Sequence, residues 1–290
     1  MKYFVLAIAM SFLLFVEADE YTEITPQLST KLNIVSHGSL PDQWLRHYEF
    51  MIRKGHENVI PIFVEFDIDN VQTIIVTDMN ATANKCGWKQ QRHILHLTFA
   101  EPRKNQKKVF TRINKPCFVG RNAVLKLTVK TADNKYYKNI TSFTASQNAF
   151  SPISHANYNA TVNEPKAHKL IQDNKLKIKR VALEDSPIYW VYLMDQSYPG
   201  KDDFIVISAD FDVKMVDAIM IEDLNAMNKK CGQNQVKRPL FLKFTDPSKN
   251  QKSITTQIVE PCYYKDRTKL KLSVKTIDNK YYYNTVSLRR

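Results

Sequence analysis

The sequence predicts an all-β protein of two tandem homologous domains, each resembling a β-sandwich and each closed by one disulfide. Three observations support this fold class: the chain matches itself after a shift of 145 residues, its strand candidates alternate apolar and polar residues, and its four cysteines recur with equal spacing. The disulfides expected from that spacing are Cys86–Cys117 and Cys231–Cys262.

The internal duplication sets the domain organisation. Residues 86–139 align with residues 231–284 without a gap, and 27 of the 54 positions are identical. Self-similarity at a fixed spacing is the signature of repeated structural units. We therefore expect a first β-domain over residues 28–143, a linker rich in Ser, Asn, Ala and Pro over 144–170, and a second β-domain over 171–290.

The first 18 residues have the pattern of a signal peptide. Lys2 supplies a positive start, residues 4–16 form an apolar run too short to span a bilayer, and Ala18 provides a small residue for cleavage. Cleavage after Ala18 would place the mature chain in an oxidising, extracellular compartment, where disulfides persist. No later stretch is apolar enough to cross a membrane, so we expect no transmembrane segment.

Strand signals recur at matching places in the two copies. Residues 71–76 are rich in β-branched side chains, and residues 124–130 and 269–275 alternate apolar and polar positions. The pairs Asp133-Asn134 and Asp278-Asn279 predict turns, because Asp and Asn tolerate left-handed backbone and bond to it. About seven or eight short strands in each domain are typical of a sandwich or a small barrel.

The cysteine spacing favours pairing within each copy. Four cysteines allow three connectivities, so this pairing depends on the duplication. In the chain-entropy model, each bridge would stabilise the folded state by roughly 3–4 kcal/mol, because it closes a loop in the unfolded chain. A zinc site is not favoured, because no histidine accompanies the second pair.

Candidate catalytic groups do not recur between the copies. His93 and His96 are the most suggestive pair, but the second copy has Arg and Phe at their positions. Asp78 and Asp223 do recur, directly after a predicted strand, where a turn explains them better than acid–base catalysis. No nucleophile elbow, zinc-protease helix or phosphate-binding glycine loop is present. We expect a non-enzymatic protein without metal or cofactor.

The chain is strongly basic, with a formal net charge of +13. This charge favours an anionic glycan, an anionic membrane surface or an acidic protein as partner, while secretion argues against nucleic acid; the alternative is that the charge serves solubility alone. Two loops at matching places in the copies carry much of the positive charge. The lysines on residues 175–180 fit an edge strand that is protected against pairing with other chains. The anion-binding candidates in the loops are Arg103, Lys104, Lys107, Lys108, Lys249 and Lys252.

Three Asn-x-Ser/Thr sequences are candidate glycosylation sites. They begin at Asn80, Asn139 and Asn159. In a secreted protein such sequences are acceptors for surface glycans.

One block of each copy resembles a family of small secreted arthropod domains named after multiprotein bridging factor two. The block contains a strand ending in Asp, then Leu-x-Leu-x-Phe with a polar hairpin and a return strand. The family's paired glycines are absent, and this chain adds cysteines and a C-terminal hairpin. The resemblance implies a secreted, non-enzymatic β-domain of the kind found in venom and saliva. The matching segments are 71–78 with 95–113, and 216–223 with 240–258.

These observations lead to a hypothesis with two alternatives. The leading hypothesis is a secreted two-domain binding or effector protein of venom or saliva, which acts through surface loops on an extracellular protein. The first alternative is an extracellular structural or carrier protein that binds anionic glycans. The second is an enzyme of a type that no motif identifies.

Overall fold

A computed structural model shows the predicted all-β fold with both expected disulfides. It describes residues 26–36, 59–87, 93–103, 107–114, 116–144, 170–182, 204–232, 240–244 and 252–290. The predicted signal peptide and most of the predicted linker lie outside the described residues, as do Lys104, Lys249 and Asn159.

The first half of the chain contributes eight of the strands described. They are β1 (Gln27–Leu28), β2 (Leu32–Ser36), β3 (Val59–Phe66), β4 (Val71–Asp78), β5 (His93–Arg103), β6 (Lys108–Asn114), β7 (Asn122–Thr131) and β8 (Tyr136–Thr144). One helical turn, α2 (Met79–Thr82), follows β4.

The second half of the described chain repeats this order. Its strands are β9 (Leu170–Gln172), β10 (Leu176–Val181), β11 (Phe204–Phe211), β12 (Val216–Asp223), β13 (Leu240–Phe244), β14 (Ser253–Val259), β15 (Arg267–Thr276) and β16 (Tyr281–Arg289). The helical turn α5 (Leu224–Met227) follows β12, as α2 follows β4.

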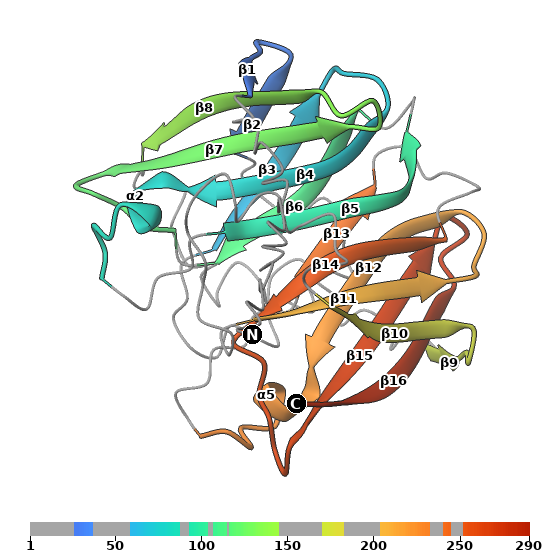
Figure 1. Cartoon of the computed structure of the whole chain (residues 1–290). Helices are drawn as coiled ribbons and strands as arrows, with labels where there is room; N and C mark the ends of the chain where they lie inside the picture. Colours follow the sequence, from blue (N-terminus) through green and yellow to red (C-terminus); the bar gives the residue numbers. More distant parts are fainter. Residues whose placement is uncertain are drawn as a thin grey trace, which may run out of the picture.

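The strands form two eight-stranded sheets, and each sheet takes strands from both repeats (Figure 1). Sheet A has the order β1-β8-β7-β4-β5-β14-β11-β10, and sheet B has the order β2-β3-β6-β13-β12-β15-β16-β9. Each repeat therefore places five strands in one sheet and three in the other. The larger set of the first repeat lies in sheet A, and that of the second lies in sheet B.

The two repeats are joined by two strand pairings. In sheet A, β5 pairs with β14 through three residue pairs, and in sheet B, β6 pairs with β13 through two. Two hydroxyl groups reinforce this junction: Thr111 Oγ1 donates to Phe241 O at 2.8 Å, and Thr256 Oγ1 donates to His96 O at 2.7 Å. Both sheets thus continue from one repeat into the other.

Alternation along the strands fills the space between the sheets. On β7, Leu125, Leu127 and Val129 are buried and belong to one hydrophobic core that also includes residues of the second repeat, such as Phe211 and Leu272. Each buried side chain of this size stabilises the fold by about 1.5–3 kcal/mol relative to exposure. The core therefore holds the two sheets and the two repeats together.

The two one-turn helices were not predicted from the sequence. Each begins after an aspartate whose side chain accepts hydrogen bonds from backbone N–H groups of the turn, Asp78 for α2 and Asp223 for α5. A cap of this kind satisfies donors that a helix start leaves unpaired. Four residues are too few to produce a helical periodicity in the sequence.

Because the repeats share both sheets and one core, we expect them to unfold together. Replacing Cys86 and Cys117 with serine should lower the free energy of unfolding by roughly 3–4 kcal/mol, since the bridge closes a loop between cysteines 31 positions apart. Calorimetry should show one transition at a lower temperature, and the variant lacking Cys231 and Cys262 should behave alike. Two separate transitions, only one of them shifted, would contradict the shared core.

Candidate functional site

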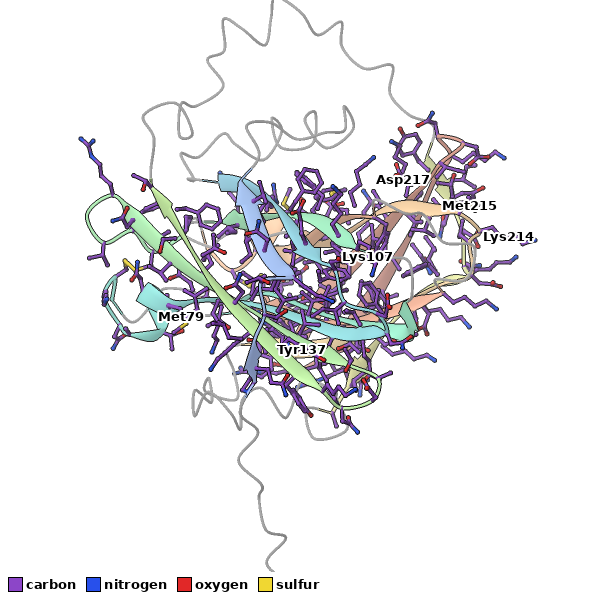
Figure 2. All side chains as sticks on the ribbon, turned by 90° about the horizontal axis from the view of Figure 1, so that it is seen from above. Met79, Lys107, Tyr137, Lys214, Met215 and Asp217 are labelled. Atoms are coloured by element: carbon purple, nitrogen blue, oxygen red, sulfur yellow. A yellow bond between two sulfur atoms is a disulfide. The ribbon has the colours of Figure 1, made fainter. Side chains whose placement is uncertain are left out.

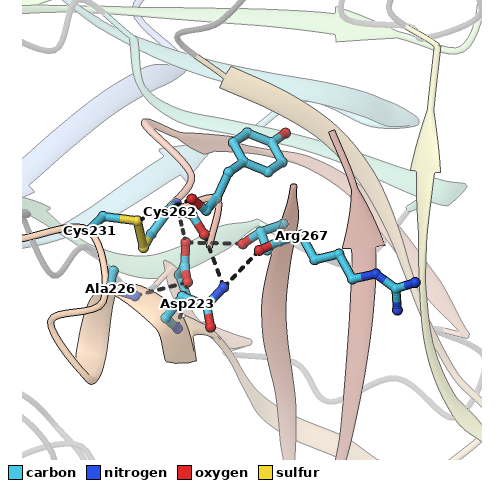
Figure 3. Close-up of a disulfide and its surroundings, with 8 residues drawn as sticks. Asp223, Ala226, Cys231, Cys262 and Arg267 are labelled. Carbon is cyan, nitrogen blue, oxygen red and sulfur yellow. Dashed lines mark hydrogen bonds between the residues drawn. A yellow bond between two sulfur atoms is a disulfide. The ribbon is translucent and has the colours of Figure 1, made fainter. Parts of the chain in front are cut away.

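The disulfide of the second repeat lies beside a carboxylate that ties several chain segments together (Figure 3). One oxygen of Asp223 accepts from the N–H groups of Asn225 at 2.9 Å and Ala226 at 3.1 Å. The other accepts from Cys262 N at 2.6 Å and from Thr268 Oγ1 at 3.2 Å. Through these four hydrogen bonds the carboxylate of Asp223 holds the turn, the cysteine and β15 in place.

Asp78 has the same function in the first repeat. Its carboxylate accepts from Ala81 N at 3.0 Å and from Cys117 N at 2.7 Å. Burial raises the pKa of Asp78, while its hydrogen bonds from backbone N–H groups act in the opposite direction. The position of Thr268 is taken by Ala123, so this carboxylate lacks the hydroxyl donor of the second repeat. The turn interpretation of both aspartates agrees with these contacts.

Asn80 is a structural residue in the fold, and glycosylation at this position is not compatible with it. Its side chain is 4% exposed, and its Nδ2 donates to Cys117 O and to Asn122 O, both at 3.0 Å. Asn225 makes the matching bonds to Cys262 O and Arg267 O without being part of a glycosylation sequence. A glycan on Nδ2 would leave this nitrogen a single hydrogen, so at least one of the two internal hydrogen bonds would be lost.

Asn139 also uses its amide nitrogen internally. Its Nδ2 donates to Leu32 O at 2.6 Å, which connects β8 of sheet A with β2 of sheet B. Asn284 makes the corresponding bond to Leu176 O at 2.7 Å and is not in a glycosylation sequence. The internal hydrogen bonds of Asn80 and Asn139 could not be predicted from the sequence, because their acceptors lie far along the chain.

The histidine and acidic candidates do not assemble a catalytic site in the described residues. His96 is buried on β5, and the side chain of His93 lies outside the described part of the structure. Asp67 and Asp69 lie in the turn between β3 and β4, where both contact Lys107. Within the described ranges, no group of three metal-ligating side chains occurs.

The basic loop of the first repeat is neutralised by neighbouring acids. Lys107 Nζ lies 3.1 Å from Asp67 and 2.9 Å from Asp69, and Lys108 Nζ lies 3.7 Å from Glu65. These contacts raise the pKa of Lys107, with the hydrogen bond to Asp69 as the largest cause. The side chain of Arg103 lies outside the described residues. The loop is therefore a poor anion site at the two lysines that can be placed.

Two lysines on β15 are also paired with acids. Lys271 contacts Glu222 at 3.3 Å, and Lys275 contacts Asp217 at 3.3 Å. Glu222 is almost fully buried, and this burial raises its pKa, opposed by the charge of Lys271. Since β15 lies between β12 and β16, its lysines do not protect an edge.

A different set of lysines surrounds an open depression of about 300 Å³ on the second repeat. It lies at the free edge of sheet A, on β10 and the adjoining ends of β11 and β14. Lys179 contacts Asp210 at 3.6 Å, whereas Lys175, Lys177 and Lys252 make no ion pair with any described residue. We name this site the lysine depression; its lining residues are Lys175, Lys177, Lys179, Asp210, Asp212, Lys252 and Ser253.

The matching surface of the first repeat has a different charge. Lys214 in the β11–β12 turn takes the position of Asp69, and its side chain extends away from the ribbon (Figure 2). The residues that line the depression include four lysines and two aspartates, a net charge of +2, and counting Lys214 raises this charge to +3. The corresponding first-repeat set is balanced, with three lysines and three acids: Lys31, Asn33, Val35, Glu65, Asp67, Asp69, Lys107 and Lys108.

The turn that follows Cys262 has a second cationic group. Tyr264 bridges to Arg267 across Lys265 and Asp266, whose φ angles are +50° and +58°. The ring of Tyr264, 43% exposed, has the Nζ of Lys230 at 5.0 Å and that of Lys265 at 5.6 Å from its centre. A left-handed backbone costs a residue such as lysine roughly 1–2 kcal/mol.

Comparisons with known proteins identify no family for this chain. No protein-family model and no curated protein matches it. A bacterial ice-binding adhesin studied for host cell surface retention has a TM-score of 0.21 and 6% identity, over 80% of this chain and 57% of that one. Red sea bream transglutaminase has a TM-score of 0.22 and 10% identity, over 90% of this chain and 32% of that one. Likeness at this level carries no argument about function.

The described residues include no helix with the length and apolar character needed to cross a membrane. Exposed ammonium groups around the open depression are suited to holding an anion by charge and hydrogen bonding.

The structural role of Asn80 gives a prediction with an internal control. Replacing Asn80 with alanine should lower the free energy of unfolding by about 1–3 kcal/mol, because the buried carbonyl of Cys117 and the partly buried carbonyl of Asn122 lose their donor. Asn225→Ala should cost a similar amount, although it removes no glycosylation sequence. Urea denaturation measures both, and a mass spectrum showing a glycan on Asn80 in the folded protein would contradict the structural role.

Proposed function

We propose that this chain is a secreted, non-enzymatic binding protein that recognises an anionic extracellular ligand through the lysine depression. The observation that carries the proposal is the charge difference between the repeats. The lining residues of the depression carry +2 against +1 at the matching first-repeat positions, and the exchange of Asp69 for Lys214 in the adjoining turn widens this to +3 against zero. Both copies keep the contacts that build the fold, such as those of Asp78 and Asp223. The excess positive charge is therefore not a requirement of the fold.

The geometry of β10 supports ligand binding. Its exposed residues Lys177 and Lys179 are two positions apart on one face, which separates their Cα atoms by about 6.6 Å. Lysine stems are flexible, so their ammonium groups can adjust to the spacing of sulfate, carboxylate or phosphate groups. Asp210 and Asp212 lie among them and limit how many anionic groups can be held at once.

The edge position of β10 has a second explanation that requires no ligand. Lysines on an exposed edge strand prevent pairing with other chains. That explanation accounts for Lys177 and Lys179, which belong to the strand. It does not account for Lys252, which precedes β14, or for Lys214 in the β11–β12 turn. The proposal therefore depends most on these two positions outside the edge strand.

Secretion and a glandular source are part of the proposal. The apolar N-terminal run and the two disulfides support an oxidising, extracellular compartment. The resemblance to secreted arthropod domains favours venom or saliva, in which the protein would act on a molecule of a host or prey. The alternative, a carrier or matrix protein that binds anionic glycans, would also bind its ligand through the lysine depression.

Expression in a secreting eukaryotic cell tests the compartment. We expect the chain in the medium, starting at Asp19 and with no free thiol, because cleavage follows Ala18 and all four cysteines are paired. N-terminal sequencing and mass measurement with a thiol reagent give both results. Retention of the chain inside the cell with its N-terminal run intact would contradict the proposed compartment.

A charge-matched pair of variants tests the lysine depression. Lys177→Gln with Lys252→Gln should weaken binding to immobilised heparin about tenfold, since two ammonium groups without ion pairs are lost. The control, Lys107→Gln with Lys108→Gln, removes the same net charge from the first repeat, where acids already contact both lysines. Surface plasmon resonance in physiological salt measures the affinities.

The comparison of these variants separates site binding from non-specific attraction. Equal losses for the two double variants would mean that net charge alone governs retention, which contradicts a site. Absence of wild-type binding to heparin in physiological salt would exclude a sulfated glycan as the ligand class. Binding should also weaken as salt rises, because exposed charges are screened.

A further inference from the structure

We infer that the turn from Tyr264 to Arg267 is a second contact point for the same ligand, and that this ligand is a linear sulfated polysaccharide. The inference rests on the proposed function and adds to it the shape of the ligand and a second site. It follows from the path of β10, the cations at its far end, and the backbone of the turn itself.

The strand β10 carries the lysine depression and ends beside the cations of the turn. At its beginning, Leu176 O accepts from Asn284 Nδ2 at 2.7 Å; near its end, Arg180 Nη1 donates to Arg289 O at 3.2 Å. The six residues of β10 extend over about 20 Å. The lysine depression lies on its outward face, and Arg180 reaches across the sandwich edge to the end of β16.

Cations gather around the end of β16. Arg267 on β15 is the strand partner of Arg289, and the N–H of Arg290 donates to Asp266 O at 3.0 Å, which fastens the C-terminus to the turn. The carbonyl of Arg267 accepts from Asn225, while its guanidinium points away from the disulfide (Figure 3). The backbone of these residues is thus bonded within the fold, while the arginine residues themselves are exposed.

The charge here again differs between the repeats. The second repeat has seven cations and one acid, a net charge of +6, at residues 229, 230, 265, 266, 267, 269, 289 and 290. The matching positions of the first repeat, 84, 85, 120, 121, 122, 124, 144 and 145, hold only Lys85 and Arg121, a net charge of +2. The lysine depression along β10 and the cationic group past its end have therefore diverged in the same direction.

The turn keeps a lysine where the backbone favours glycine. Lys265 has φ +50°, and its first-repeat counterpart is Gly120 with φ +62°. Two-residue hairpin turns with positive φ favour glycine or asparagine, because a longer side chain strains the backbone. Residues held in such conformations are concentrated at ligand-binding sites, where the side chain is needed. The ammonium groups of Lys265 and Lys230 both lie against the exposed ring of Tyr264.

The separation of the two groups selects the ligand. The depression extends over Lys175, Lys177 and Lys179, and the turn lies past Arg180, so only a ligand extended along β10 contacts both the lysines at the strand's beginning and the turn. A linear chain with regularly spaced sulfate groups can contact both groups along one edge of the sandwich. Sulfated polysaccharides are the extracellular polyanions with this form.

The experiment compares long and compact probes on the full secreted chain. The probes are a heparin-derived oligosaccharide long enough to span both groups and sucrose octasulfate, which is compact. Lys265→Gly should weaken binding of the long probe about fivefold and leave that of the compact probe unchanged, because only the long probe reaches the turn. Its melting temperature should not fall, since glycine suits this backbone.

Lys230→Gln provides a second variant that leaves the backbone of the turn unchanged, and Lys85→Gln removes the same charge at the matching first-repeat position. We expect Lys230→Gln to act like Lys265→Gly, and Lys85→Gln to bind both probes as the wild type does. Equal weakening of both probes by Lys265→Gly, or no effect on the long probe, would overturn the second contact while the lysine depression stands.

Two further outcomes concern the ligand class. If the wild type binds neither probe, a sulfated glycan is excluded as the ligand class and this inference fails. If it binds vesicles containing phosphatidylserine more tightly than the long oligosaccharide, the ligand is a membrane surface, and the assignment of a linear sulfated polysaccharide is wrong.

Discussion

The structure depends on the pairing of β5 with β14 and of β6 with β13. A β-strand at the edge of a sheet exposes unpaired N–H and C=O groups, which attract other strands. Each repeat has two such edges on the side of the junction, and each covers the edges of the other. Because β5 and β14 belong to sheet A, and β6 and β13 to sheet B, the junction extends both layers at once.

This arrangement explains how the repeats could diverge on their surfaces while keeping their contacts. The carboxylates of Asp78 and Asp223 hold matching turns, and Asn139 and Asn284 bind matching carbonyl groups between the sheets. These contacts lie where the backbone must be held. The charges at the outer edge of the second repeat make few demands on the fold, so substitutions there could accumulate without loss of stability.

Much of the fold could be predicted from the sequence, and the site only in part. Alternation on residues 124–130 and the cysteine spacing are local signals, and both predictions were confirmed. The junction could not be predicted, because it contains only three and two residue pairs. The roles of Asn80 and Lys107 depend on partners 37 or more positions away, which no local pattern reveals. The lysine depression joins residues 175 to 253, and the sequence had favoured the loops instead.

The reciprocal junction also bears on the evolutionary history of the chain. A gene that lost either repeat would encode a protein with two bare strand edges, one in each layer, and with Thr111 or Thr256 deprived of its carbonyl acceptor. Such a product would be prone to aggregation. Once strands of the two copies had been joined in this way, selection would act against deletion of either one. The copy number is thus held at two by the exposed edges that deletion would create.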